Sequence, residues 1–290
     1  MKSQSTKQGA PVAVLSRTND LPLLMFLWRW KVSTTAALSR KFYPERSAPA
    51  AYLRLWKLER AGFIKSTCNH TANVFLWTLD KRGFSVVRPY IPNMREEGYL
   101  SENLFHDLMV TAIHLGDCFF NELDTIEFVT EQELRRLDPV AFPEWVPNSN
   151  RRPDGYWGIK KALGQKVVAL EVELSVKVDT EYESIARFYE EREGIHQILW
   201  VVRRASIAEK IQAVMEKVTR RTFKHSFLIL DPFYSLGWQA TIHCGLDSGN
   251  TVNHILENKP LTNLKPVSGQ FSLDARKTPH KSKHCELFRP

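Results

Sequence analysis

Cysteine is scarce in this sequence, and its few residues are scattered. Cys68, Cys118, Cys244 and Cys285 form no C-x-x-C pair, so neither a structural zinc site nor a disulfide framework is predicted, and a reducing cytoplasm is the expected compartment. Long hydrophobic runs are also lacking. The most apolar early segment, residues 21–30, is too short to cross a bilayer, and the polar start MKSQSTKQGAP has no signal-peptide core. These absences predict a soluble chain without membrane insertion.

The length and the charge bound the class of protein. The chain has 290 residues, which is room for two modest domains and tails. Its formal net charge is +8 and its pI is near 9.3. This balance favours a polyanionic partner, most simply nucleic acid, although an ordinary basic enzyme would show the same values.

The first part of the chain shows helical periodicity and turn signals. After a polar leader over residues 1–18, which is expected to be disordered, apolar residues recur at spacings of three and four. Ser33 is the expected N-cap of a second helix, and Ser47 begins a third. Two β-like runs follow, over residues 63–67 and 74–79. Three helices and a β-hairpin predict a winged helix-turn-helix domain.

This domain, over residues 19–87, has a candidate DNA-binding surface. The segment LRLWKLERAGFI resembles the recognition helix and wing entry of bacterial winged-helix proteins. Arg54 and Lys57 are expected to face outward into a major groove, while Lys65 or His70 on the wing contacts phosphate. Two alternatives stay open: the charged residues form a solvated face, or the domain mediates protein contacts.

The second part of the chain predicts a larger mixed domain. Residues 88–98 carry two prolines and predict a linker. Residues 99–245 then predict the order helix, three strands, helix, strand, with a helix and a strand beyond. Residues 246–290 lose periodicity and are rich in lysine and arginine, which predicts a flexible basic tail. The expected fold class is therefore α+β or α/β.

Three carboxylates mark two neighbouring strands of this domain. Asp154 belongs to a first strand, and Glu171 and Glu173 belong to a second. Residues two apart on a strand share one face, and paired strands lie about 4.8 Å apart, so the three side chains are expected to converge. Carboxylate oxygens suit Mg²⁺ or Mn²⁺. The alternative is an edge strand with solvated glutamates and Asp154 capping a turn, but the apolar run VVALEVEL favours burial on both faces.

The motif and its setting resemble a known family. Asp154 in RPDG, followed by Glu171-Val172-Glu173, looks like the PD-(D/E)XK nuclease motif with Glu173 at the lysine position. A winged helix before such a restriction-endonuclease-like αβββαβ core, with His106 in an H-x-L-x-V helix, resembles the replication-relaxation proteins and MobC-type plasmid relaxases. The resemblance implies metal-dependent nicking of one DNA strand at an origin of transfer. It also implies an accessory protein and a coupling ATPase as partners.

The resemblance assigns expected roles. Asp154 and Glu171 hold the metal ion, and Glu173 completes the coordination or orients the attacking water. Lys177 neutralises charge on the phosphate. Arg151 and Arg152 are phosphate-contact candidates, and His106 is a further catalytic candidate that could act with Asp107. Common relaxases use an H-x-H histidine cluster, and no two of the nine histidines here are separated by one residue. The other readings are a catalytically inactive DNA-binding regulator or replication accessory protein, and an assembly factor.

Overall fold

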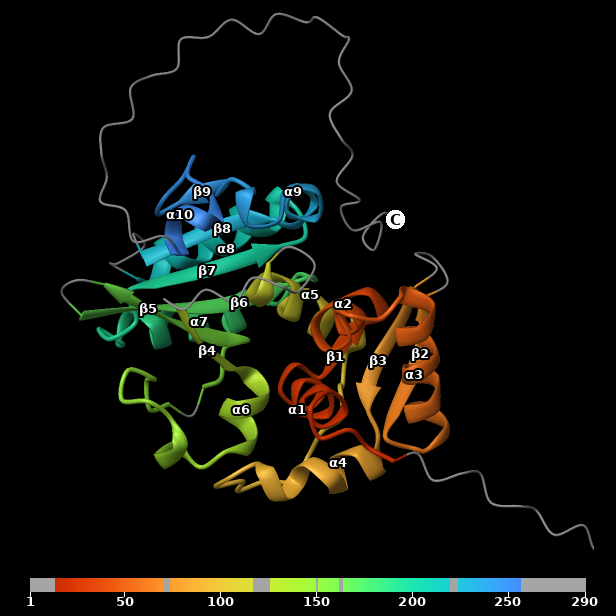
Figure 1. Ribbon diagram of the computed structural model, residues 1–290. Helices are drawn as coiled ribbons and strands as arrows, with labels where there is room; N and C mark the ends of the chain where they lie inside the picture. The colour runs from red at the N-terminus through yellow and green to blue at the C-terminus, as the bar shows by residue number, and fades with distance from the viewer. Residues whose placement is uncertain are drawn as a thin grey trace, which may run out of the picture. The chain divides into compact units, whose positions relative to one another are not determined.

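A computed structural model describes residues 14–69, 74–116, 126–149, 151–161, 164–219 and 224–256. Its internal contacts divide the chain into two compact units (Figure 1). The first contains residues up to 111 together with 135–141, and the second contains 112–134 and the residues from 142 onward. Within the described residues, no helix combines the length and the apolar character needed to span a lipid bilayer.

The first unit is a helical region with a small antiparallel sheet of order β1-β3-β2. The predicted three helices and hairpin are present, with an additional strand, β1. Its helices and strands are α1 (Asp20–Trp30), β1 (Val32–Thr34), α2 (Thr35–Phe42), α3 (Ala48–Arg60), β2 (Ile64–Asn69), β3 (Val74–Leu79), α4 (Lys81–Val87) and the short helix η1 (Arg88–Tyr90).

Local signals explain these bounds. Thr34, and not Ser33, is the N-cap of α2, because its side chain accepts a hydrogen bond from the Ala37 N–H while Ser33 pairs with Trp77 in the sheet. Ser47 is the N-cap residue of α3, as predicted. Gly62, just beyond α3, has a φ of 74°, the left-handed conformation that glycine adopts most readily.

The predicted linker belongs to the first unit. Residues 88–98 contain η1, and Arg136 forms an ion pair with Glu96 and donates to the Glu97 carbonyl. Trp28 also donates through Nε1 to the Gly98 carbonyl at 3.2 Å. This unit therefore extends to residue 111 and does not end at the prolines as the sequence suggested.

The second unit is built on a mixed sheet of order β4-β5-β6-β7-β8-β9. Strands β4, β5 and β6 are antiparallel to one another, β6, β7 and β8 are parallel, and β9 is antiparallel to β8. The elements from the helix that leads into this unit onward are α5 (Leu104–Leu115), β4 (Ile126–Thr130), α6 (Glu131–Arg136), η3 (Pro139–Ala141), β5 (Gly155–Lys161), β6 (Gly164–Glu173), α7 (Asp179–Glu190), β7 (Gln197–Val202), α8 (Ala205–Val218), β8 (His225–Ile229), α9 (Leu230–Leu236), η5 (Gly237–Gln239), β9 (Cys244–Gly245) and α10 (Val252–Leu256).

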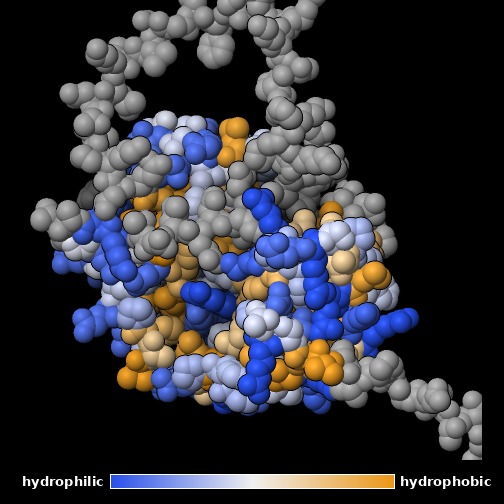
Figure 2. Space-filling view, viewed as in Figure 1, coloured by the Kyte–Doolittle hydropathy of each residue, from blue (hydrophilic) through white to orange (hydrophobic). Residues whose placement is uncertain are grey.

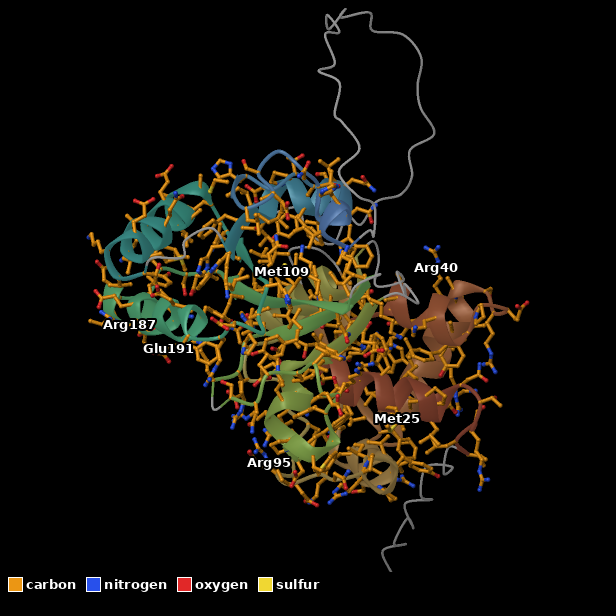
Figure 3. All side chains as sticks on the ribbon, turned by 90° about the vertical axis from the view of Figure 1, so that its left-hand side faces the viewer. Met25, Arg40, Arg95, Met109, Arg187 and Glu191 are labelled. Carbon is orange, nitrogen blue, oxygen red and sulfur yellow. The ribbon has the colours of Figure 1, made fainter. Side chains whose placement is uncertain are left out.

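One face of this sheet is covered by α7 and α8. Residues that alternate along β6, Val167 and Ala169, pack in one cluster with Tyr182, Ile185 and residues of α8. The crossover helix α7 is what allows β7 to run parallel to β6. Figure 3 shows Arg187 and Glu191 on the outer side of α7, away from the sheet. On the visible surface, hydrophobic residues lie in separate patches among hydrophilic ones (Figure 2).

The sequence prediction places the start of the tail, at residue 246, too early in the chain. Residues 246–256 are described, and they include α10, whose Val252, Ile255 and Leu256 are buried. A helix of five residues is too short to produce a periodic signal in the sequence. Residues 257–290, most of the predicted leader and His70 lie outside the described residues.

Candidate functional site

The register of β5 and β6 places Asp154 beside Glu171. Gly155 pairs with Leu170 at the end of the antiparallel ladder, so Asp154 lies just beyond the ladder, next to the end of β6 that carries Glu171. The Asp154 N–H donates to the Leu170 carbonyl at 2.9 Å. Glu171 and Glu173 alternate with Val172 and lie on the α7 face of the sheet, where they are 7% and 4% exposed. The predicted pairing of the two motif strands is confirmed, and the solvated-edge alternative is wrong, because β6 has β5 on one side and β7 on the other.

Glu171 is a buried carboxylate with four polar or charged neighbours, Asp154, Arg151, Tyr189 and Lys177. The Tyr189 hydroxyl of α7 donates to its Oε1 at 2.5 Å, and Arg151 Nη2 lies 3.7 Å from the same atom. Burial, and then the charge of Asp154, raise the pKa of Glu171 to about 7, although Arg151, Tyr189 and Lys177 act in the opposite direction. The protein thus holds two carboxylates close enough that their charges oppose each other.

Asp154 is fixed through its side chain and its backbone. Its Oδ2 accepts a hydrogen bond from the Val172 N–H at 2.7 Å. Behind it, His114 Nε2 lies 3.2 Å from the Asp154 carbonyl oxygen, and His114 Nδ1 accepts from Trp157 Nε1 at 2.8 Å. Because Nδ1 accepts, the ring proton is on Nε2, which donates to the carbonyl. A Cβ at Gly155 would lie 2.4 Å from His114 Nε2, so only glycine permits this approach.

His114 is a functional-site residue that sequence reasoning missed. It is fully buried and lies in the last turn of α5. A lone histidine on an apolar helix carries no signal of its partner, which is 40 residues away in the sequence. Tyr189 was missed for the same reason. Tyr156 and Trp157, which follow the motif aspartate in the sequence, are completely buried core residues.

Glu173 is paired with Lys177. Lys177 Nζ lies 2.7 Å from Glu173 Oε2, although the lysine is beyond the end of β6. The backbone N–H of Lys177 donates to the Tyr182 hydroxyl at 3.0 Å, and its carbonyl oxygen accepts from Lys210 Nζ at 3.0 Å. Burial lowers the pKa of Lys177, but its hydrogen bond to Glu173 and the charges of Glu173, Glu171 and Asp154 raise it above the ordinary value. Lys177 is therefore a cation that interacts with all three predicted carboxylates.

The three carboxylates that were predicted to hold a metal ion have different surroundings. Across the described ranges, no group of three or more histidine, cysteine, aspartate or glutamate side chains is arranged to hold a metal. Asp154 and Glu171 oppose each other at one place, whereas Glu173 is occupied by Lys177. Two opposed carboxylates fit a divalent cation that takes its other ligands from water and phosphate, as Mg²⁺ commonly does.

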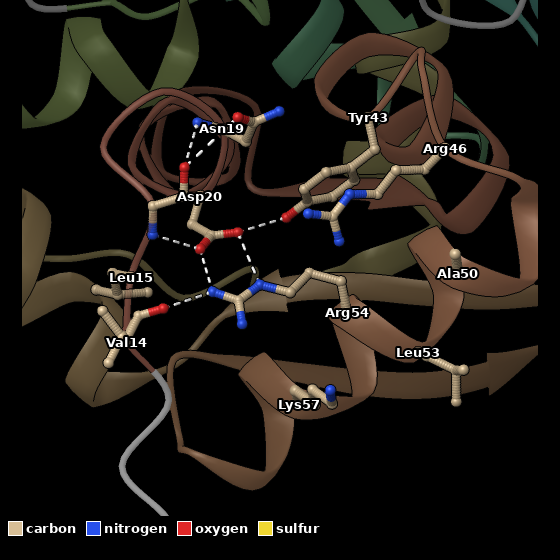
Figure 4. A pocket seen from close by; sticks show the side chains of 11 residues that line it. Val14, Leu15, Asn19, Asp20, Tyr43, Arg46, Ala50, Leu53, Arg54 and Lys57 are labelled. Carbon is tan, nitrogen blue, oxygen red and sulfur yellow. Dashed lines mark hydrogen bonds and ion pairs between the residues drawn. The ribbon is translucent and has the colours of Figure 1, made fainter.

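Arg54 does not face outward as the sequence predicted, because its guanidinium is bound by the Asp20 carboxylate. Its Nε donates to Asp20 Oδ1 at 3.1 Å, its Nη2 forms an ion pair with Asp20 Oδ2, and Nη2 also donates to the Val14 carbonyl (Figure 4). Tyr43 completes the cluster by donating to Asp20 Oδ1 at 2.7 Å. The periodicity of α3 places Arg54 outside the apolar stripe of that helix, which predicted an exposed side chain. The Asp20 carboxylate is wholly buried and requires a charged partner, which Arg54 supplies.

The other basic candidates differ in exposure. Lys57, Lys65 and Arg152 are exposed. Arg151 is half-buried, with its guanidinium 6.0 Å from the Phe188 ring centroid and close to Glu171. These positions leave Lys57 and Lys65 in the first unit, and Arg152 in the second, as surface cations.

His106 and Asp107 belong to the first unit. His106 Nδ1 lies 3.6 Å from Asp107 Oδ1, and Lys31 Nζ lies 3.3 Å from the same oxygen. Burial alone would raise the pKa of Asp107, but His106, Lys31 and Ser101 together lower it. The two residues therefore form a local charged cluster with Lys31.

Comparison with known proteins adds little to this picture. No family model and no curated protein matches the chain. A solved structure of ZitR from Lactococcus lactis, the C30AH42A mutant in apo form, is 28% identical over 24% of this chain and 52% of its own, with a TM-score of 0.21. The chain thus spans about half of that protein, and an overlap so small and loose assigns neither a fold nor a function.

Proposed function

We propose that this protein is a DNA-binding, metal-dependent endonuclease that nicks one strand at an origin of transfer, as the MobC-type relaxases do. The observation that carries this proposal is the pairing of the half-buried Asp154 with the buried Glu171 next to the Lys177 ammonium. Opposed carboxylates in a buried site are unfavourable unless a cation joins them. An accessory protein and a coupling ATPase are the partners that this role would require.

The architecture of the second unit supports the nuclease assignment. Apart from α6 and η3, which are inserted between β4 and β5, the order α5, β4, β5, β6, α7, β7 matches the αβββαβ order of a restriction-endonuclease-like core. Asp154 lies just before the second strand of that order, and Glu171 and Glu173 are at the carboxyl end of the third. This is where the PD-(D/E)XK motif has its acidic residues.

The first unit supports DNA binding. Its helices and its three-stranded sheet have the order of a winged helix-turn-helix, with α3 as the recognition helix and β2 and β3 as the wing. Lys57 and Arg60 are exposed on α3, and Lys65 is exposed on β2. Lysine and arginine at these positions suit phosphate and base-edge contacts in a major groove.

The site residues then divide the work of hydrolysis. Asp154 and Glu171 would hold Mg²⁺ or Mn²⁺, which supplies Lewis-acid polarisation of the phosphate and lowers the pKa of a bound water. Tyr189 and the Val172 N–H orient the two carboxylates. Lys177, held by Glu173, neutralises charge that develops on the phosphate oxygens. Glu173 is therefore assigned a positioning role in place of the predicted ligand role.

A plasmid-relaxation assay tests the proposal. Supercoiled plasmid carrying DNA from the genetic neighbourhood of the protein is incubated with Mg²⁺, with Mn²⁺ or with EDTA. We expect metal-dependent conversion to the open circle, lost by about 10³-fold or more in Asp154→Ala and Glu171→Ala. A linear product would contradict nicking and indicate a double-strand nuclease, and retained nicking in either variant would contradict the assigned site.

Lys177→Met is expected to lower the rate of nicking by about 10²- to 10³-fold without changing duplex affinity. The reason is that it removes the cation next to the carboxylates and leaves the DNA-binding unit intact. Single-turnover kinetics of plasmid relaxation and a mobility-shift titration measure the two quantities. Lys217→Met, at an exposed position in the last turn of α8, is the matched control. Equal loss in both variants, or a change in Kd alone, would contradict the assigned role of Lys177.

A second candidate function is a DNA-binding regulator or replication accessory protein with an inactive core. The observation that favours it is the shortage of ligands: the structure opposes two carboxylates, and Glu173 is engaged by Lys177. A mobility shift with plasmid DNA, but no open circle with either metal at any protein concentration, would support this candidate over the nickase.

A further inference from the structure

A groove crosses the first unit between α2, α3 and the wing. Its volume is about 620 Å³, within the range of small-molecule sites. Thr35 and Ser39 of α2 lie on one side, Tyr52 of α3 lies on another, and Phe75 of β3 closes the wall. The exposed Lys57 of α3 does not line this groove. The groove is therefore a surface separate from the exposed basic residues that would enter a DNA major groove.

Aromatic rings form the groove wall. The ring centroids of Tyr52 and Phe75 are 5.9 Å apart and the planes are tilted by 44°. Trp77 lies behind them, 6.5 Å from Tyr52 and 6.3 Å from Phe75, and is completely buried. Its Nε1 donates to Thr35 Oγ1 at 2.8 Å, which ties the strand to α2. Tyr52 and Phe75 are only half-buried, so part of each ring faces the groove on a rigid support.

Two arginines lie at the groove, Arg40 on α2 and Arg46 in the turn before α3. The Arg46 guanidinium lies 5.4 Å from the centroid of the Tyr43 ring (Figure 4). Tyr43 is itself fixed by Asp20. Arg40 is exposed, and its side chain extends away from the ribbon in Figure 3. The described residues that line the groove include no aspartate or glutamate.

We infer that this groove binds an unpaired nucleotide of single-stranded DNA, with the base against Tyr52 and Phe75 and the phosphate at Arg46 and Arg40. Aromatic faces and a cationic rim are the two features that bind single strands without base pairing. The inference deepens the proposed function, on which it rests for the choice of DNA. It adds a strand-binding site in the same unit as the duplex-binding helix.

The groove favours an unpaired base over a duplex. In a duplex, both faces of each base are covered by neighbouring bases, so Tyr52 and Phe75 have no free face to contact. An unpaired base next to a nick or in a melted origin presents that face. Charge complementarity selects the phosphate backbone, because the two arginines at the groove attract a polyanion.

The test is fluorescence anisotropy of labelled oligonucleotides with the full chain in EDTA, where no cleavage occurs. The probes are a 20-nucleotide thymidine strand, a hairpin duplex of equal charge, and free thymidine monophosphate as an unlabelled competitor. We expect Phe75→Leu to weaken binding of the single strand by about tenfold and the duplex by less than twofold. Arg46→Gln is expected to lower the slope of log K against log salt for the strand by about 0.7.

Matched controls are Tyr90→Leu, an aromatic residue that is 56% exposed and outside the groove, and Arg17→Gln, an exposed arginine outside it. Circular dichroism melting confirms that each variant folds, and Arg46→Gln decides the question if Phe75→Leu does not fold. Strand affinity within twofold of the unchanged protein in both groove variants would overturn the inference, as would equal losses for strand and duplex. Full displacement of the labelled strand by free thymidine monophosphate at concentrations near the Kd of the strand would assign the groove to a free nucleotide and also overturn the inference. Strand binding does not depend on nicking, so failure of the plasmid assay leaves this result readable.

Discussion

Replacing Glu171 with glutamine is expected to abolish nicking and, at the same time, to stabilise the folded protein above pH 7. The carboxylate is a proposed metal ligand, so activity falls by about 10³-fold or more. The amide keeps an acceptor oxygen for the Tyr189 hydroxyl, which donates at 2.5 Å, but removes the charge that opposes Asp154. A variant that loses activity and gains stability is the result expected of a site that is strained until a cation binds.

The sign of the stability change follows from the pKa of Glu171. Its ordinary value is 4.5, and burial together with Asp154 raises it to about 7 in the folded protein. Between these values the folded state holds a proton that the unfolded state has released. The free energy of unfolding therefore falls as pH rises from about 4.5 to about 7 and stays low above it. At 1.36 kcal/mol per pKa unit, the loss is on the order of 3 kcal/mol.

Thermal unfolding in EDTA at pH 5 and at pH 8 measures this effect. The glutamine variant should unfold several degrees higher than the unchanged protein at pH 8 and close to it at pH 5. Glu191→Gln, at the exposed C-cap of α7, should shift neither midpoint. Equal stability of Glu171→Gln and the unchanged protein at pH 8 would mean that Glu171 is not held against an opposing charge.

Arg54→Leu is expected to destabilise the first unit by about 3–5 kcal/mol, because it leaves the buried Asp20 carboxylate without its cation. Burial raises the pKa of Asp20, but hydrogen bonds from Arg54, the Ser16 N–H and Tyr43 lower it below its ordinary value. Urea unfolding monitored by tryptophan fluorescence measures the loss. Lys57→Leu, one turn along α3 and exposed, should stay within about 0.5 kcal/mol and weaken duplex binding.

The pH dependence separates the ion pair from other effects of the substitution. A lowered carboxylate pKa contributes stability that is present above the unfolded value near 3.8 and is lost as pH falls through the folded value. The stability difference between the unchanged protein and Asp20→Asn should therefore shrink below about pH 4. If Arg54→Leu unfolds like the unchanged protein but loses duplex affinity, Arg54 contacts DNA after all.

Alternation and periodicity in the sequence are enough to predict the two strands that carry the site and their pairing. The run VVALEVEL places Glu171 and Glu173 on one face of a buried strand, and the antiparallel pairing with the Asp154 strand follows from the short turn between them. Those features depend on neighbours along the chain. For the same reason, the helices and strands of both units were predicted within a few residues, apart from short elements such as β1, α6, α9 and α10.

The partners of the site residues could not be predicted, because they come from distant parts of the chain. Tyr189 reaches Glu171 across 18 residues, and Asp20 reaches Arg54 across 34. No local pattern distinguishes an arginine that faces solvent from one that neutralises a buried carboxylate. Lys177 is close to Glu173 in the sequence. Strand alternation, however, predicts the direction of side chains only within a strand, and Lys177 lies beyond the end of β6. The pairing of Lys177 with Glu173 could therefore not be predicted, although both residues were candidates for the site.

The central position of β6 has a consequence for how the site can relax. Its backbone is hydrogen-bonded to β5 from Gly164 to Leu170 and to β7 from Val168 to Glu173, so the residues from Val168 to Leu170 are paired on both sides. A segment enclosed in this way opens only when the surrounding unit unfolds, so its amide protons should be among the slowest to exchange with deuterium. Glu171 and Glu173 follow directly on this enclosed segment, so opening of the strand is not an easy way to separate Asp154 and Glu171. A proton on Glu171, or a cation at the proposed metal site, would relieve the repulsion between the two carboxylates with the strand in place.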